Sequence, residues 1–242
     1  MTPIGVSVRG LLAAGLALLL SAPVPLVAQR TARGLREVRD VGSGGVNLVL
    51  AVPTGEFRSN VDIAGGLNVF GAFNLGRSDA VALRLDGSYL IYGSQNRVVT
   101  QPFYPVSINS TYSIATFGVG PQVTLGQGPV RLYGFGTFGA SYIWVRSSYG
   151  VDGCGCDAFA SGTDFDDWTA ALQGGGGLLV NLRSRHVPIA LDLGARYLSN
   201  GDAWYVSPGD VVPQPNGDVV VYPVRSKANL VMFHLGVALA IQ

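Results

Sequence analysis

Opposite charges recur at short, even spacings in two segments of the chain. Arg84 and Asp86 are separated by one residue, and Asp192 and Arg196 lie four positions apart, each pair inside an otherwise apolar stretch. Successive side chains of an extended strand point to opposite faces, so each pair would share one face of its strand. Charges gathered on an enclosed face can neutralise each other as ion pairs, or they can line a narrow path for ions or solutes.

Histidine is the commonest general acid or base in enzymes, and this chain has two histidines. His186 lies in the short polar stretch RSRH. His234 lies in the C-terminal stretch NLVMFHLGVALAIQ, with no Ser two residues on and no carboxylate beside it in sequence. A Ser-His-acid arrangement is recognised by its geometry in space, so an enzyme acting on membrane lipid remains an alternative function. We expect His234 to be a buried interior residue and the protein to have no catalytic residue.

The two cysteines, Cys154 and Cys156, are separated by a single glycine. In an oxidising compartment two cysteines usually pair, although this spacing closes a small, strained and labile ring. We expect a local disulfide. Free thiols, an intermolecular bridge and a metal site are the alternatives, and the last would need more ligands than lie nearby in sequence.

Two further motifs suggest ligand chemistry that their details do not support. Asp164, Asp166 and Asp167 lie close together, but their spacing does not match a calcium-binding loop of twelve residues, so they predict a solvated acidic turn. The GGGG stretch at 174–177 is not followed by the Lys-Ser/Thr pair of a phosphate-binding loop. Glycines in a strand instead allow bending and the close approach of neighbouring side chains. We therefore expect no metal ion and no cofactor.

The composition is unusual for a soluble protein. Charged residues make up 13% of the chain, against about a quarter in typical domains, and there are 34 glycines. The net charge of +1 gives no electrostatic reason to expect a nucleic-acid partner. The mean hydropathy is +0.34, yet beyond the N-terminal region no apolar run approaches the roughly 20 residues of a membrane helix. The apolar residues alternate with small or polar ones, as in closed barrels that face lipid.

The N-terminal region, 1–29, has the features of a secretory signal peptide. Arg9 precedes the apolar run LLAAGLALLL, and small residues surround Ala28. Pro23 and Pro25 interrupt the run before it is long enough to span a membrane. We expect cleavage near Ala28 and export from the cytoplasm.

Two regions follow the predicted signal peptide. Residues 30–45 are polar, basic and end in glycine, which predicts a flexible periplasmic lead-in. Residues 46–242 form one domain, because eight segments of about ten residues with two-residue alternation recur along them. These segments are 46–52, 62–76, 80–93, 111–126, 130–145, 167–182, 187–199 and 229–242.

Short and long connections alternate between the eight segments. The short ones are RSD, QGP and RSRH, and the long ones are 53–61, 94–110, 146–166 and 200–228. In bacterial barrels short turns face the periplasm and long loops face outward, so both termini would be periplasmic. Aromatic residues near the long connections predict an outer girdle at the level of the lipid headgroups: Tyr89, Tyr92, Tyr112, Tyr142, Trp144, Trp168 and Tyr197. Phe73 and Tyr133 are the candidates for an inner girdle.

These features resemble a known family. The signal peptide, the eight alternating strands, the AVPTGEF exit from the first strand and the alternating last strand are similar to those of small outer-membrane β-barrels. That family includes the transmembrane domain of outer membrane protein A and the adhesin-type barrels. The resemblance covers roughly residues 46–242 and implies insertion by the barrel-assembly machinery. Family members usually end on an aromatic residue, whereas this chain ends in Ile241-Gln242.

The sequence therefore predicts an all-β fold: an eight-stranded antiparallel up-and-down transmembrane β-barrel in the outer membrane. The lumen would hold a polar cluster of Arg84, Asp86, Asp192, Arg196 and His234, because charge on the lipid face costs about 2–4 kcal/mol near the midplane for Arg or Lys. We expect a structural, adhesive or weakly permeating role, with outer-membrane lipid and extracellular ligands of the loops as partners. A soluble lipocalin-like carrier is a further alternative, with the apolar face turned inward.

Overall fold

The computed structural model describes residues 41–59, 61–76, 80–100, 105–126, 128–151, 160–182, 189–207, 211–213 and 219–241. The predicted signal peptide, most of the lead-in, Cys154, Cys156 and His186 lie outside these residues. The chain divides into two compact units, Met1–Glu37 and Val38–Gln242, and all described residues belong to the second. Among the described residues, no helix has the length and apolar character needed to cross a membrane.

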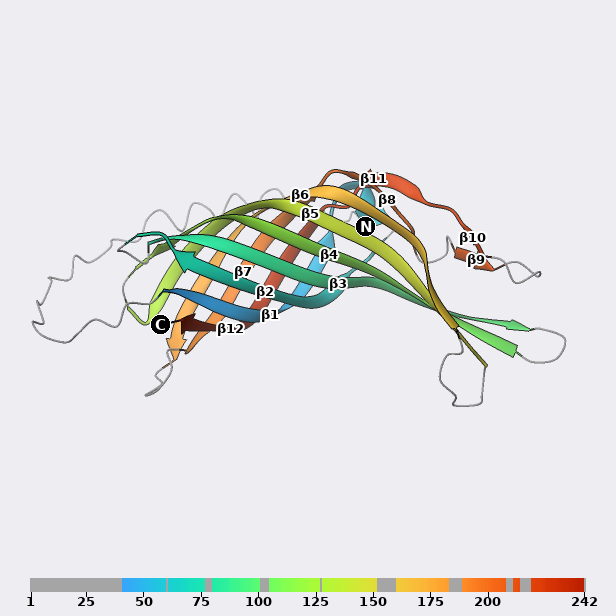
Figure 1. The fold of residues 1–242 in the computed structure, drawn as a ribbon, viewed down its shortest axis with the longest axis horizontal. Coiled ribbons are helices and arrows are strands. Elements are labelled where there is room, and N and C mark those ends of the chain that lie inside the picture. Colours follow the sequence, from blue (N-terminus) through green and yellow to red (C-terminus); the bar gives the residue numbers. More distant parts are fainter. Residues whose placement is uncertain are drawn as a thin grey trace, which may run out of the picture. The chain divides into compact units, whose positions relative to one another are not determined.

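Eight strands close into a barrel, in the order β1-β12-β7-β6-β5-β4-β3-β2 (Figure 1). Each strand pairs antiparallel with its neighbours around the ring, and β12 closes the barrel on β1. The eight strands are β1 (Gly42–Pro53), β2 (Ala64–Asn74), β3 (Val81–Thr100), β4 (Pro105–Leu125), β5 (Val130–Val151), β6 (Ala160–Leu182), β7 (Ile189–Asn200) and β12 (Leu230–Ile241). The predicted fold class is confirmed, and β1 begins four residues earlier than expected.

The two-residue alternation of the sequence becomes the two faces of the barrel wall. Leu48 of β1 pairs with Leu235 of β12, which pairs with Leu193 of β7. All three side chains point outward, and Leu48 is 66% exposed. The outward face is a continuous apolar belt, which includes Val46, Leu50, Leu67, Val69, Leu83, Leu85, Phe117, Val119, Phe138, Leu172, Phe233, Val237 and Leu239. This is the outer surface of a transmembrane barrel, since hydrocarbon requires an apolar exterior and a closed ring of hydrogen-bonded strands.

The two ends of the barrel differ in their connections. At the turn end, β2 joins β3, β4 joins β5 and β6 joins β7 by short turns. Gly76 and Gly126 begin two of these turns with φ of 105° and 95°, a conformation that side-chain-bearing residues rarely adopt. The other four connections lie at the opposite end, which we call the loop end.

Four strands continue past the ring at the loop end. The β3–β4 pairing runs to Thr100 and Pro105, and the β5–β6 pairing runs to Tyr149 and Ala160, whereas β7 ends at Asn200. Figure 1 shows β3 to β6 running on as a shared ribbon. We call this part the extension; it comprises 93–100, 105–112, 146–151 and 160–165. The prediction of long polar loops over 94–110 and 146–166 was therefore wrong for the described residues of both segments.

Residues of the connections from β1 to β2 and from β7 to β12 pack into the loop end of the lumen. The first contains a short 3-10 helix, η1 (Gly55–Ser59). The connection from β7 to β12 contains two hairpins: β8 (Asp202–Tyr205) pairs with β11 (Val224–Lys227), and β9 (Val211–Pro213) pairs with β10 (Val219–Val221).

The aromatic girdle is smaller than predicted. Tyr89, Tyr142, Trp144, Trp168 and Tyr197 lie on the outward face of the wall, and Trp168 is 58% exposed. Tyr92 and Tyr112 are instead buried inside the barrel, because Tyr92 continues the lumen face of Arg84 and Asp86 on β3 and Tyr112 shares the lumen face of β4. Of the inner candidates, Phe73 points outward but Tyr133 is buried in the lumen.

Candidate functional site: the barrel lumen

The lumen is filled by layers of different chemistry. Towards the turn end lies a small cluster that contains the rings of Phe70, Tyr133 and Phe135. A network of charged and amide side chains fills the middle. Neutral polar side chains follow, and the loop end is occupied by a larger apolar cluster. An eight-stranded barrel is just wide enough for its side chains to fill the interior, and this interior follows that rule.

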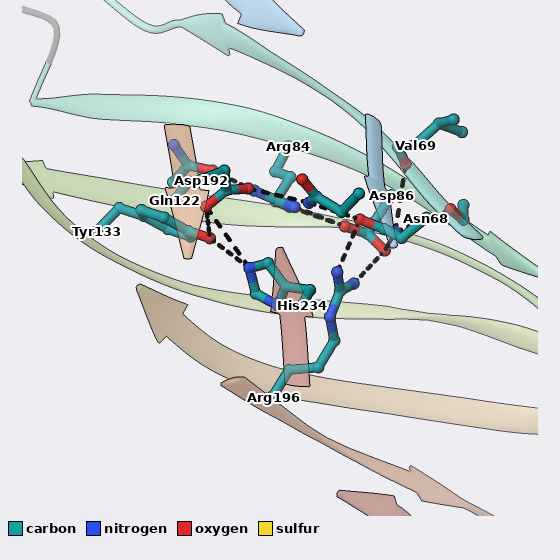
Figure 2. A network of polar contacts seen from close by, with 11 residues as sticks. Asn68, Val69, Arg84, Asp86, Gln122, Tyr133, Asp192, Arg196 and His234 are labelled. Atoms are coloured by element: carbon teal, nitrogen blue, oxygen red, sulfur yellow. Dashed lines mark hydrogen bonds and ion pairs between the residues drawn. The ribbon is translucent and has the colours of Figure 1, made fainter. Parts of the chain in front are cut away.

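The middle of the lumen is organised around Asp86, a residue of β3. Its carboxylate accepts hydrogen bonds from Arg84 at 2.8 Å and from Arg196 at 2.7 Å, so one carboxylate bridges two guanidinium groups (Figure 2). Asn68 donates to Asp86 at 2.8 Å and accepts from Arg196 at 2.7 Å. All the side chains of the two ion pairs are fully buried. Buried ion pairs offset their desolvation only when their remaining hydrogen bonds are satisfied, which Asn68 and Gln122 help to achieve.

A second group centres on Asp192 of β7. Asp192 accepts hydrogen bonds from the Tyr133 hydroxyl at 2.6 Å and from the Asn47 amide at 2.9 Å. His234 Nε2 lies 2.8 Å from the Tyr133 hydroxyl and 3.6 Å from Asp192. Figure 2 shows the Tyr133, Asp192 and His234 side chains converging in the lumen. The five residues singled out from the sequence thus lie in two adjacent polar groups.

Aromatic rings and glycines provide the space for the two arginines. The Arg84 guanidinium lies 4.0 Å from the Phe70 ring centroid and 4.3 Å from that of Phe135, distances typical of cation–π contact. A Cβ at Gly175 would lie 2.5 Å from Arg196 Cβ, closer than non-bonded carbons can approach. The glycine stretch of β6 therefore serves packing, in the way expected from the sequence, and it lies inside a strand.

A ring of neutral polar side chains lies between this network and the loop end. Thr116 hydrogen-bonds to Ser141 at 2.8 Å, and Ser141 donates to Asn200 at 2.8 Å. Asn200 in turn donates to the carbonyl of Ala228 in the β11–β12 connection at 2.7 Å. Hydrogen bonds therefore connect three barrel strands to the returning loop.

The loop end is closed by an apolar cluster that we call the stopper, formed by Phe57, Tyr205 and Val206 against the lumen wall. The Phe57 ring of η1 lies edge-on to Tyr205 at 4.9 Å and to Tyr92 at 5.6 Å. The Tyr92 hydroxyl donates to the carbonyl of Val206 at 3.1 Å. Phe57, Tyr205 and Val206 have no exposed surface. Side chains from two long connections thus fill the lumen as the core of a soluble domain would be filled.

The geometry gives little support to catalysis or metal binding. His234 is 4% exposed, and its ring nitrogen Nε2 lies against Tyr133 and Asp192 rather than a serine. Within the described part of the chain, no three His, Cys, Asp or Glu residues are grouped to hold a metal ion. Asp167, expected in a solvated turn, accepts hydrogen bonds from the backbone amides of Trp168 and Trp204 at 2.8 Å each.

Several residues of the lumen were not singled out from the sequence. Tyr133, Asn47, Asn68 and Gln122 complete the two polar groups. Their alternation carried a signal, since Asn68 and Gln122 lie on the polar faces of their segments. The sequence gives almost no sign of the stopper, because Phe57 is a single aromatic residue in a polar connection.

No family model matches the chain, and no curated protein does. The fold is similar to those of three solved proteins of outer-membrane or surface type. The attachment invasion locus protein Ail of Yersinia pestis is 14% identical over 83% of this chain and 99% of its own, with a TM-score of 0.40. Neisserial surface protein A is 15% identical over 82% and 96%, with a TM-score of 0.38. A major outer membrane protein of Thermus thermophilus is 14% identical over 82% and 99%, with a TM-score of 0.39.

Proposed function

We propose that this protein is an integral outer-membrane barrel without catalytic activity, whose lumen is closed and whose role is structural or adhesive. One observation carries the proposal: the polarity of a soluble protein is inverted in the barrel wall. Leu48 and Leu235 face outward while Arg84 and Asp192 are buried. Such a wall suits hydrocarbon on the outside and would aggregate in water.

The closed lumen argues against a permeating role. Fully buried ion pairs fill the middle and the stopper fills the loop end, so no continuous aqueous path is built into this arrangement. Function would then depend on the surface exposed beyond the membrane. The extension and the β8–β11 hairpin supply that surface, with Trp204 and Arg225 paired across the hairpin. An extracellular ligand would bind there.

The two alternatives are less well supported. An enzyme acting on lipid would need its catalytic histidine to reach a substrate, whereas His234 is buried in the lumen and bonded to Tyr133. A lipocalin-like carrier would place its apolar face inward along the whole barrel. Here the outward face is apolar, and a lumen with ion pairs at its centre does not suit an apolar ligand.

Two measurements test the proposal. Cells expressing the full chain are fractionated, and the purified protein is run on gels with and without heating. We expect the protein in the outer membrane and a change of mobility on heating, since a closed barrel resists detergent until heated. Recovery from the soluble periplasm would contradict membrane insertion. Stable conductance steps in a planar bilayer would contradict the closed lumen but leave the barrel intact.

A further inference from the structure

Three polar side chains between the central network and the stopper have atoms without partners. Gln173, Thr137 and Ser88 are 2%, 2% and 5% exposed. Within the described part of the chain, both amide atoms of Gln173 and the hydroxyls of Thr137 and Ser88 lack a hydrogen-bond partner. A buried polar group without a partner costs about 1–3 kcal/mol, so native interiors rarely leave one unpaired. Four such atoms in the lumen require an explanation.

Two of these side chains face a common space. Gln173 of β6 and Thr137 of β5 are paired across the sheet. Gly118 of β4 lies beside them, and a Cβ placed on it would be 2.9 Å from Thr137 Oγ1 and 3.4 Å from Gln173 Nε2. The unpaired atoms of Thr137 and Gln173 therefore lie next to a residue that has no side chain of its own. Ser88 follows Asp86 on the lumen face of β3, and Asp86 pairs with Gly118.

We propose that these polar side chains form a site, which we call the collar site, that binds ordered water inside the membrane barrel. The chemistry of the unpaired atoms selects the ligand. Gln173 presents an unpaired donor and an unpaired acceptor, and only a ligand that both donates and accepts can satisfy both. Water does so, whereas chloride only accepts. A cation would satisfy only the acceptors and would leave the Gln173 amide donor unpaired.

The surroundings would hold such water in place. On the loop side, the stopper and the buried Leu90, Ile114 and Leu198 form an apolar layer. On the other side lie the ion pairs of Asp86. A buried water usually makes about three hydrogen bonds, so four unpaired atoms correspond to about one or two molecules. The collar site would therefore be a closed, hydrated layer between a charged layer and a dry one.

Nuclear magnetic resonance of the whole chain refolded in detergent tests the proposal. We expect water cross-peaks to the Gln173 side-chain amide protons and to the Gly118 backbone amide. Gln173→Leu combined with Thr137→Val should remove the Gly118 cross-peak and keep heat-modifiable mobility. Ile114→Val, in the apolar layer, should leave all of these signals unchanged.

Either of two results would overturn the collar site. The first is a wild-type spectrum without water cross-peaks at Gln173 and Gly118 although exposed residues of the extension show them. The second is a chemical-shift change at these groups on titration with chloride or sodium, which would assign the collar site to an ion. The wild-type spectrum decides the matter even if the double variant does not fold.

Discussion

Neighbouring residues of β3 lie in opposite environments. Arg84 has no exposed surface, while Leu85, next in the chain, is 48% exposed. In water this order would be reversed, because burying a charge is costly and burying a leucine is favourable. The arrangement is stable only if lipid covers Leu85 and hydrogen-bonding partners surround Arg84. Single substitutions can therefore test both halves of the statement.

Leu235→Arg tests the outward face. Leu235 pairs with Leu48 and Leu193 in the apolar belt, and an arginine near the midplane is expected to cost about 2–4 kcal/mol of unfolding free energy. Val98→Arg is the matched control, since Val98 is 51% exposed but belongs to the extension. Its effect should stay within about 0.5 kcal/mol. Urea unfolding in phospholipid vesicles, followed by tryptophan fluorescence, measures both; equal effects would place the belt outside lipid.

Asp86→Asn tests the lumen. The substitution leaves the guanidinium groups of Arg84 and Arg196 without their shared carboxylate, and breaking a buried pair in this way costs about 3–5 kcal/mol. Asp62→Asn removes an exposed carboxylate and should change stability by less than about 0.5 kcal/mol. The same urea titration compares the two variants. A loss for Asp86→Asn no larger than for Asp62→Asn would mean that the network does not stabilise the barrel.

At the scale of the element, β6 shows how one sequence motif serves two faces. Gly175 points into the lumen and lies against Arg196, whereas a Cβ at Gly174 would meet no atom within 4 Å. Adjacent glycines of one run thus have different roles. The inward one provides space, and the outward one does not.

This difference gives a prediction at adjacent positions. Gly175→Ala should lower the unfolding free energy by about 1–3 kcal/mol, since its Cβ would overlap Arg196 and the Ala195 carbonyl. Gly174→Ala should be neutral or slightly stabilising, because alanine restricts the unfolded chain more than glycine does. Urea unfolding again gives the comparison. Similar losses at both positions would show that backbone flexibility, rather than space for Arg196, is what β6 needs.

Elements were predictable from sequence where one face meets lipid, and not elsewhere. All eight barrel strands were found, because the outward face of each is uniformly apolar. In the extension the alternation is largely polar, so stretches such as SINST in β4 resemble loops although Ile108 and Ser110 are buried. Tyr92 shares the alternating face of Arg84 and Asp86, so the alternation of β3 already predicts that it lies in the lumen rather than in the girdle. The partners of Asp86 come from different strands, and spacing within one strand cannot reveal them.

For the whole barrel, the lumen is closed at two separate levels, by the stopper and by the ion-pair network. The stopper depends on η1 and the β8–β11 hairpin, while the ion-pair network depends only on residues of the barrel wall. Loss of one seal should therefore leave the other in place. If the lumen stays closed after the stopper is lost, the barrel is filled along its length. If it opens, the barrel is closed only by its loops.

Phe57→Ala tests that independence. Removing the ring withdraws the contacts to Tyr92 and Tyr205, so hydrogen exchange should accelerate at the backbone amides of η1 and β8. Amides of β1 and β12 near the turn end should keep their protection, and heat-modifiable mobility should persist. Planar-bilayer conductance should stay absent, because Arg84, Asp86 and Arg196 still fill the middle of the lumen. Stable conductance steps in this variant alone would mean that the stopper is the only seal and that the ion pairs line a path rather than block it.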